Sequence, residues 1–327
     1  MDPPEFPEPP VEAGPVWQVI VLSWNGRDDT LRCLRSLREI RRGDVGIICV
    51  DNGSTDGSQQ AIRELFPDVA LIEAGQNLGY AGGNNLGLRQ ALRSGARWMA
   101  LVNNDATVAP DVIDGFERAI AVRPDAGLLG GKVYFDDRPE TIWFAGQRVN
   151  TLIGYSGRPR GYGRRDGARY SRVVDTGRAV GALMAVSRSA LEAVGLLDQA
   201  LFAYVEDIDL ALRLREAGFA VVFAPDARAR HRVSASTGGE EGSTHTLYYG
   251  VRNTVSVLER QRPLGRMGTA LRRCTILVTF VLHAATRTNR RAAIAAVRAG
   301  YADAREGRLG PRTPDNQERR PDSSTLR

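Results

Sequence analysis

WMALVNND, residues 98–105, places an apolar run directly before a polar turn. The first five residues have the pattern of a buried strand, and Asp105 comes just after its end. Ligands of open α/β sheets bind beyond the carboxyl ends of the strands, and hard divalent cations take carboxylate oxygens. Asp105 is therefore a candidate ligand for Mg²⁺ or Mn²⁺ together with a diphosphate. The alternative is an ordinary strand-end turn, where Asn and Asp are favoured.

The chain before this stretch alternates strands with helices. Apolar runs of strand length occupy 16–23, 45–50 and 69–72, and helical patterns begin at Asp28 or Asp29 and cover 59–66 and 81–94. Short strand–helix alternation is typical of a parallel sheet with helices on both faces. The sequence predicts an α/β fold with a mostly parallel, Rossmann-like sheet flanked by helices.

Beyond Asp105 the alternation is less regular. Pro110 begins a helix that reaches about Val122. A stretch rich in glycine and arginine at 158–172 has no periodicity and predicts a long loop. Further strands are predicted at 127–134, at the end of 176–187, at 220–223 and at 227–232, with a short helix at 189–194.

The glycines of NLGYAGGNNLG, residues 77–87, differ from a dinucleotide fingerprint. They do not form G-x-G-x-x-G, and they follow the third predicted strand instead of the first. A nicotinamide-dependent dehydrogenase is therefore disfavoured. Small residues beside Asn77, Asn84 and Asn85 nevertheless let the backbone approach a ligand closely and offer neutral hydrogen-bond partners.

An acidic cluster opens a predicted helix that ends at Gly218. Glu206, Asp207 and Asp209 lie in LFAYVEDIDL, residues 201–210. Acidic residues at a helix N-terminus are favoured by the helix dipole, so a capping role is one interpretation. The other is general base catalysis, because a carboxylate can deprotonate an attacking hydroxyl group. Tyr204 beside the cluster could then form part of a wall for a sugar.

His231 ends another predicted strand after the acidic helix. A lone histidine is more often structural than a ligand, but the chain has only three histidines. At the end of a strand, its imidazole could complete a metal site with Asp105.

Composition and cysteine usage describe an intracellular globular protein. Apolar residues make up 43% and charged residues 25%, with a net charge of +6 that is almost entirely arginine, since Lys132 is the only lysine. Cys33, Cys49 and Cys274 form neither a metal motif nor a disulfide framework, which indicates a reduced, cytoplasmic compartment. The acidic, proline-rich residues 1–15 lack a signal-peptide pattern and predict a disordered tail.

The end of the chain predicts a helical region at 241–309 and a disordered tail at 310–327. Its apolar run at 274–285 has twelve residues, fewer than the roughly 20 needed to span a bilayer. Arginines on both sides fit an interfacial helix, so peripheral contact at the inner face of the cell membrane is one interpretation. A helix packed on the predicted α/β domain is the other, and the sequence leaves both open. Nucleic-acid binding is disfavoured because no such motif accompanies the arginines.

Six segments in order resemble the inverting glycosyltransferases of family 2, which have the GT-A fold. They are VIVLSWNG, VDNGSTDGS, NLGYAGGNNLGL, LVNNDA, GLLDQALFAYVEDIDLALRLREAGF and PDARARHRVSAS, and they span about residues 16–236. Each segment alone is weak, whereas six in this order are specific. The resemblance implies a GT-A catalytic domain at 16–240, and it is strongest to the rhamnosyltransferase-like branch.

The resemblance also implies roles for individual residues. Asp207 would be the catalytic base, oriented by Glu206, and Asp105 and His231 would bind Mg²⁺ or Mn²⁺. The residues expected to bind the nucleotide-sugar donor are Ser23, Asn25, Asp51, Asn77, Gly79, Asn85 and Asn104. One departure concerns the metal: the usual Asp-x-Asp is Asn103-Asn104-Asp105 here, which implies a weaker metal site that relies partly on the donor diphosphate.

The expected reaction is a single displacement that inverts the anomeric carbon, with L-rhamnose from dTDP-rhamnose as the expected donor sugar. The expected acceptor is a hydroxyl group on a lipid-linked glycan or a natural product. Transfer of another nucleotide-linked hexose is the alternative. A nucleotidyltransferase is disfavoured because VLSWNGRDD lacks the glycine-rich basic signature usual near the first strand of such enzymes.

Overall fold

Four parallel strands form the first half of the sheet. The computed structural model of the chain describes residues 16–151, 158–232 and 239–312, so the tails predicted at 1–15 and 310–327 lie outside it except for 310–312. β1 (Trp17–Ser23), β2 (Val45–Asp51), β3 (Ala70–Glu73) and β4 (Trp98–Asn103) lie in the order β3-β2-β1-β4. All three strand pairs among them are parallel, as the alternating pattern predicts.

The second half of the sheet is mixed. β9 (Leu183–Ser187) runs antiparallel between β4 and β6 (Ala126–Phe135), and β10 (Ala220–His231) is parallel to β6. β5 (Ala106–Val108) pairs antiparallel with the end of β10, and the short β7 (Ile142–Phe144) and β8 (Val174–Asp175) pair with β6 and β10. The sheet is therefore less parallel than the alternation suggests, because β9 enters from the opposite direction.

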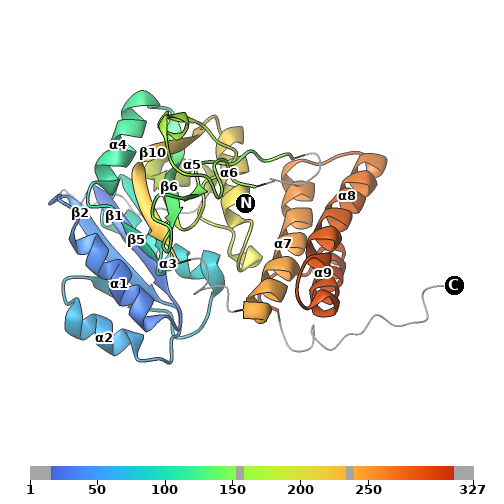
Figure 1. Cartoon of the computed structure of the whole chain (residues 1–327), viewed down its shortest axis with the longest axis horizontal. Coiled ribbons are helices and arrows are strands. Elements are labelled where there is room, and N and C mark those ends of the chain that lie inside the picture. Colours follow the sequence, from blue (N-terminus) through green and yellow to red (C-terminus); the bar gives the residue numbers. More distant parts are fainter. Residues whose placement is uncertain (1–15, 152–157, 233–238, 313–327) are drawn as a thin grey trace.

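Helices cover both faces of the sheet (Figure 1). Buried residues of α1 (Arg27–Arg38), α2 (Ser58–Leu65) and α4 (Val112–Val122) share one core cluster with the strands. The other cluster contains residues of α3 (Gly79–Arg93), α5 (Arg188–Val194) and α6 (Glu206–Glu216). Trp17 stacks on Trp98 and Phe116, with ring centroids 5.6 and 5.9 Å away. Truncating a buried aromatic such as Phe116 to Ala should cost about 3–5 kcal/mol of stability.

β10 joins the two short strands predicted at 220–223 and 227–232. Its pairing with β6 shifts register between Ala224 and Arg228, around Pro225. Proline cannot donate to the ladder and is tolerated in a sheet at such a bulge. The strand therefore continues to His231, which is paired in register with Ala106 at the start of β5.

Three helices form a layer of their own beside the sheet. α7 (Gly239–Gln261), α8 (Arg266–Ala285) and α9 (Arg290–Arg305) have a separate apolar cluster that includes Val251, Val255 and Val297. In Figure 1, α7 lies between α6 and the outer pair α8 and α9. α8 is longer than the predicted apolar run, and it packs mainly on α7 and α9. None of the described helices is long and apolar enough to cross a membrane.

Candidate active site

The polar residues predicted at strand ends meet at one edge of the sheet. Ser23 ends β1 opposite Asp51, which ends β2, and Leu22 is paired in register with Asn103 at the end of β4. Parallel strands bring their carboxyl ends to the same edge, and open α/β sheets bind ligands there. Segments that are far apart in sequence therefore supply one site.

Asp51 shapes the turn after β2. It is fully buried, and its Oδ1 accepts hydrogen bonds from the backbone N–H of Gly53 and Ser54 and from Gln59 Nε2, at 3.1, 3.0 and 2.7 Å. Its Oδ2 is buried without a hydrogen-bond partner. Buried polar atoms normally have partners, so an unpartnered carboxylate oxygen at this edge fits a donor group of a ligand.

Asn25 and Asn104 lie in the loops that surround this edge. Asn25 Oδ1 accepts from the backbone N–H of Thr55 at 2.8 Å, which joins the loops after β1 and β2. Asn104 Nδ2 donates to the Thr30 hydroxyl at 3.0 Å, and that hydroxyl is 2.8 Å from Ser23 Oγ. The Ser23 side chain, which is fully buried, therefore takes part in this internal chain of hydrogen bonds.

Asn77 and Gly79 form the start of α3. Asn77 Oδ1 accepts from the backbone N–H of Gly79 at 2.8 Å and from Asn52 Nδ2 at 3.1 Å. Gly79 has φ +72°, and a Cβ there would overlap the carbonyl oxygen and ring of Phe202. Asn52, which no pattern within VDNGSTDGS singles out, also accepts from the Leu78 N–H at 3.0 Å. It ties the turn after β2 to α3.

Asn85 is engaged with protein backbone in both directions. Its Nδ2 donates to the Leu197 carbonyl at 2.8 Å, and its Oδ1 accepts from the Leu197 N–H at 3.1 Å. The side chain is buried, so in this structure it joins α3 to the chain that precedes α6.

Asp105 and His231 are brought together as the sequence predicted. Asp105 Oδ1 is 2.8 Å from His231 Nε2, and both side chains are buried. The contact forms because β5 turns back after Asp105 and pairs with the end of β10. Trp143 on β7 packs against the imidazole in an edge-to-face arrangement, with ring centroids 4.8 Å apart.

Asp105 could hold a divalent cation beside His231. Asp105 Oδ2 is buried without a hydrogen-bond partner, which leaves a carboxylate oxygen available at the sheet edge. Within residues 16–151, 158–232 and 239–312 no group of three or more His, Cys, Asp or Glu side chains could hold a metal. Mg²⁺ usually keeps waters and takes few protein ligands beside substrate phosphates. A carboxylate and an imidazole therefore suffice only when a diphosphate supplies further oxygens.

Glu206 and Asp207 open α6 as a buried acidic pair. Asp207 Oδ2 lies 3.4 Å from Arg178 Nε, and Glu206 Oε2 is buried without a hydrogen-bond partner. Burial and the adjacent Asp207 charge raise the pKa of Glu206 well above the ordinary glutamate range. Burial also raises the pKa of Asp207, although the Arg178 guanidinium opposes the shift. The pair therefore prefers to keep one proton.

Asp209 has a different environment from its two neighbours. Its Oδ2 pairs with Arg213 at 2.8 Å, and its Oδ1 accepts from Arg260 and Gln261 of α7, both at 2.9 Å. With both oxygens engaged and no solvent exposure, Asp209 fastens α6 to α7. The sequence places all three acidic residues in one helical turn. Their partners separate the structural Asp209 from the pair Glu206 and Asp207.

Two residues beside the acidic pair were not expected from the sequence. Arg178 comes from the loop before β9. Tyr80 is the other residue, and its pKa is strongly raised, mainly by burial and also by the charges of Glu206 and Asp207. The Tyr80 hydroxyl donates to the Gly181 carbonyl at 3.3 Å. Neither stretch carries a spacing that would indicate contact with α6, since the contacts depend on β9 entering the sheet.

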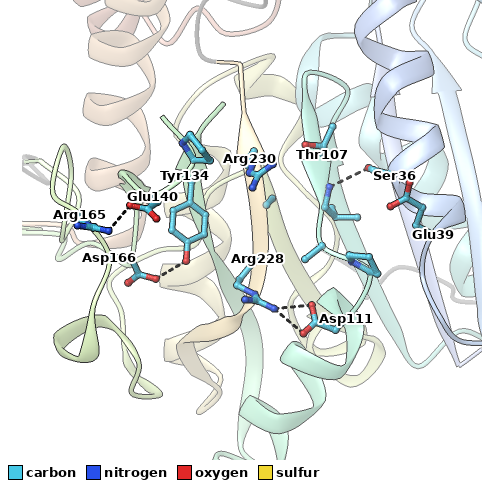
Figure 2. A pocket seen from close by; sticks show the side chains of 15 residues that line it. Ser36, Glu39, Thr107, Asp111, Tyr134, Glu140, Arg165, Asp166, Arg228 and Arg230 are labelled. Atoms are coloured by element: carbon cyan, nitrogen blue, oxygen red, sulfur yellow. Dashed lines mark hydrogen bonds and ion pairs between the residues drawn. The ribbon is translucent and has the colours of Figure 1, made fainter. Parts of the chain in front are cut away.

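A pocket of about 670 Å³ lies over β5 and β10 (Figure 2). Its charged walls are largely paired: Arg228 contacts Asp111 at 2.9 Å, and Arg165 contacts Glu140 at 2.8 Å. The pocket is lined by none of the predicted site residues. The candidate site therefore rests on the hydrogen-bond and burial pattern of the strand ends.

The fold is that of glycosyltransferases of the GT-A type. The mannosyltransferase PcManGT of Pyrobaculum calidifontis, solved with GDP-Man and Mn²⁺, superposes with a TM-score of 0.54 at 19% identity, covering 92% of this chain and 78% of that one. GalNAc-T7, solved with UDP, GalNAc and Mn²⁺, gives 0.56 at 13% identity, covering 84% and 58%. These likenesses show the fold.

Residues 18–195 match the family described as "Glycosyl transferase family 2", and the chain belongs to this family. The N-acetylglucosaminyl-diphospho-decaprenol L-rhamnosyltransferase of Mycobacterium tuberculosis is 30% identical over 246 residues, which are 70% of this chain and 80% of that protein. The O-antigen biosynthesis protein RfbC of Myxococcus xanthus is 28% identical over 241 residues, 69% of this chain and 18% of that protein. The family predicted from the six segments is confirmed.

Proposed function

We propose that this glycosyltransferase moves L-rhamnose from dTDP-rhamnose to a hydroxyl group of a lipid-linked glycan, with inversion of the anomeric carbon. The observation that carries the reaction type is the buried pair Glu206–Asp207 with Arg178 beside it. The sugar and the acceptor class are supported by the relative from Mycobacterium tuberculosis, which is named for both.

Asp207 is the proposed base. An attacking hydroxyl needs a carboxylate within hydrogen-bond reach, and a base is more effective when its pKa lies above the ordinary aspartate range. Burial supplies that shift, while Arg178 keeps the carboxylate available in its charged form. Glu206 is proposed to orient Asp207 and to hold the proton that the pair retains.

The donor is proposed to lie along the edge formed by the ends of β1, β2 and β4. The unpartnered Asp51 Oδ2 would accept from the base or the ribose of the nucleotide. The other donor contacts are proposed for the residues around this edge, namely Ser23, Asn25, Asn77, Gly79, Asn85 and Asn104. Among these, Ser23 and Asn85 act in part through the loops that they fasten.

Asp105 and His231 would hold Mg²⁺ or Mn²⁺ against the donor diphosphate. A bound cation there would offset the charge that develops on the leaving diphosphate. Asn103 and Asn104 are neutral, so the protein alone supplies one carboxylate. Metal binding is therefore proposed to strengthen when the donor is present.

The acceptor is proposed to reach the site from a membrane, which places the enzyme in the cytoplasm at the inner face of the cell membrane. The cysteines are free among the described residues, in keeping with a reducing compartment. A lipid-linked acceptor requires contact with a lipid surface, and no nucleic-acid partner is proposed.

The test is a panel of nucleotide sugars with an N-acetylglucosaminyl diphosphate lipid as acceptor, read by mass spectrometry. We expect one deoxyhexose to be added from dTDP-rhamnose in the presence of Mg²⁺ or Mn²⁺. Addition of a hexose from another nucleotide donor would replace the donor assignment and leave the reaction type. Transfer of a nucleotidyl group, or no transfer from any donor, would contradict the proposal.

A further inference from the structure

A stripe of exposed apolar side chains runs along one face of α8. Met267 is 86% exposed, Leu271 69%, Val278 51% and Leu282 65%, and Cys274 between them is also exposed. Their spacing of three and four residues places all five on one side of the helix. Contiguous apolar exposure of this kind marks an interaction surface.

The opposite face of α8 is already occupied. Ile276 and Ala284 are buried, and Leu277 and Phe280 pack on the cluster shared with α7 and α9. The helix therefore has one apolar face inside the helical layer and a second apolar face outside it. Packing within the chain explains only the first.

The polar side chains beside the stripe already have hydrogen-bond partners within the helix. The Thr275 hydroxyl donates to the Leu271 carbonyl at 2.9 Å, and the Thr279 hydroxyl donates to the Thr275 carbonyl at 2.8 Å. Threonine hydroxyls bonded to the preceding helical turn can enter an apolar environment without leaving a polar group unpartnered.

Both ends of the stripe are basic. Arg266 begins α8, and Arg287, Arg290 and Arg291 follow its last turn. None of these four forms an ion pair within the part of the chain that the structure describes. The sequence has no acidic residue between Glu259 and Asp303. The stripe therefore combines apolar side chains with free positive charge at each end.

We propose that this face of α8 lies on the surface of a membrane that contains anionic lipid. Apolar burial and attraction between arginines and anionic headgroups both favour such contact. A second copy of the chain is a poorer partner. If the α8 faces of two copies packed together, parallel or antiparallel, arginines of one copy would lie against arginines of the other, with no acidic side chain to pair with them. This inference deepens the proposed function, since a lipid-linked acceptor lies in a membrane.

The test compares two variant pairs by vesicle sedimentation. One carries Leu271→Glu and Leu282→Glu on the stripe, and the matched control carries Leu65→Glu and Val122→Glu, which are exposed positions of α2 and α4. Vesicles contain phosphatidylcholine with or without phosphatidylglycerol. We expect the parent and the control to bind the phosphatidylglycerol vesicles and to be released as salt rises. The stripe variant should bind at least about tenfold more weakly.

Far-ultraviolet circular dichroism serves as an independent measure of folding, and all three proteins should give the same spectrum. Equal vesicle binding by the stripe variant and the control would overturn the inference, as would no binding of the parent. Light scattering that shows a parent dimer and a monomeric stripe variant would assign the face to a second copy and also overturn it. None of these outcomes depends on the identity of the transferred sugar.

A second feature concerns the loop that precedes the acidic pair. Phe202, Tyr204 and Val205 all have positive φ, at 64°, 66° and 74°. Such angles are uncommon outside glycine, and for a β-branched residue such as Val205 they are strained. A strained backbone persists only where surrounding contacts hold it, and Val205 is the residue directly before Glu206.

Asn253 of α7 provides these contacts. Its Nδ2 lies 2.9 Å from the Leu201 carbonyl and 2.8 Å from the carbonyls of Ala203 and Tyr204. Its Oδ1 accepts from Arg252 Nε at 2.9 Å, and an Arg252 terminal nitrogen also donates to Leu201, again at 2.9 Å. One buried amide nitrogen, with two N–H groups to donate, thus contacts three backbone carbonyls of the loop.

We infer that Asn253 is a positioning residue for the reaction, because it sets the backbone from which Glu206 and Asp207 extend. The inference rests on the proposed function of that pair. A displacement of about 1 Å at a reacting group can lower turnover by as much as about a hundredfold without weakening substrate binding. The C-terminal helices are therefore part of the catalytic unit.

The test uses Asn253→Ala, with Asn289→Ala as the matched control. Asn289 caps α9 through the Ala292 N–H at 3.2 Å, so its loss affects stability alone. We expect Asn253→Ala to lower kcat by about ten- to a hundredfold with an unchanged donor KM, and Asn289→Ala to retain parental kcat. If Asn253→Ala keeps the parental kcat while Asp207→Asn is inactive in the same assay, Asn253 has no positioning role, and the proposed function still stands. Full activity of Asp207→Asn would instead contradict the proposed base.

Discussion

Three acidic side chains within one turn of α6 have unlike surroundings. Asp209 shares its two oxygens among Arg213, Arg260 and Gln261, whereas Asp207 has Arg178 on one oxygen and the N–H of the next residue on the other. A helix-dipole effect would favour all three alike. Their different partners predict different consequences of substitution.

Asp207→Asn should lower turnover by at least about a hundredfold, within the range of general base catalysis. The amide is nearly isosteric, so the donor affinity and the melting temperature should change little. Initial rates with calorimetry of dTDP binding measure both.

Asp209→Asn is the control within the same turn. It should destabilise the fold by about 1–3 kcal/mol, because Arg213 and Arg260 lose a buried carboxylate, and its turnover should fall less than that of Asp207→Asn. Near-parental turnover in Asp207→Asn would show that Asp207 only caps the helix.

The Asp105–His231 pair makes a prediction about metal. Asp105→Ala should abolish turnover and remove the effect of Mn²⁺ on dTDP affinity, because the only carboxylate of the proposed metal pair is lost. Titration of dTDP with and without Mn²⁺ provides a measure that does not depend on turnover. Full turnover of the parent enzyme in excess EDTA would exclude the metal role.

At the scale of elements, the start of α3 supports the loop before α6. Gly79 and Gly57 both have positive φ. A Cβ at Gly79 would overlap the Phe202 backbone, whereas a Cβ at Gly57 would have no atom within 4 Å. Gly79→Ala should therefore lower both the melting temperature and kcat. Gly57→Ala should lower the melting temperature alone, through backbone strain of about 1 kcal/mol. Equal effects of the two substitutions on kcat would show that the α3–loop contact does not position the acidic pair.

At the scale of the whole molecule, the buried acidic pair makes stability depend on pH. The folded-state pKa of Glu206 is raised by burial and by Asp207, so the folded chain keeps a proton that the unfolded chain loses above about pH 4.3. Stability from this group should then fall as pH rises from that value to the raised pKa. Glu206→Gln has no titrating group at this position and should not lose this stability. As pH rises from about 4.3 to the raised pKa, the melting temperature of the parent should therefore fall relative to that of Glu206→Gln. A difference in melting temperature between the two proteins that stays constant with pH would contradict the raised pKa of Glu206.

Periodicity and strand-end chemistry were enough to predict the first half of the molecule. The regular strands and helices through β4 lie close to their predicted ranges, because local hydrophobic pattern decides both their type and the face they bury. Asp105 and His231 were also expected to meet, since both end strands. The antiparallel entry of β9 and the edge strand β5 could not be predicted, because pairing direction depends on contacts distant in sequence.

The sequence by itself determined the family and the residues available for chemistry, since six ordered segments and a few strand-end carboxylates are local properties of the chain. Only the tertiary structure decided which partners each carboxylate has. Arg178, Arg260 and Asn253 reach α6 and its loop from other elements, and these contacts separate Asp207 from Asp209. The open face of α8 was likewise decided by packing, because apolar spacing alone does not tell a buried face from an exposed one.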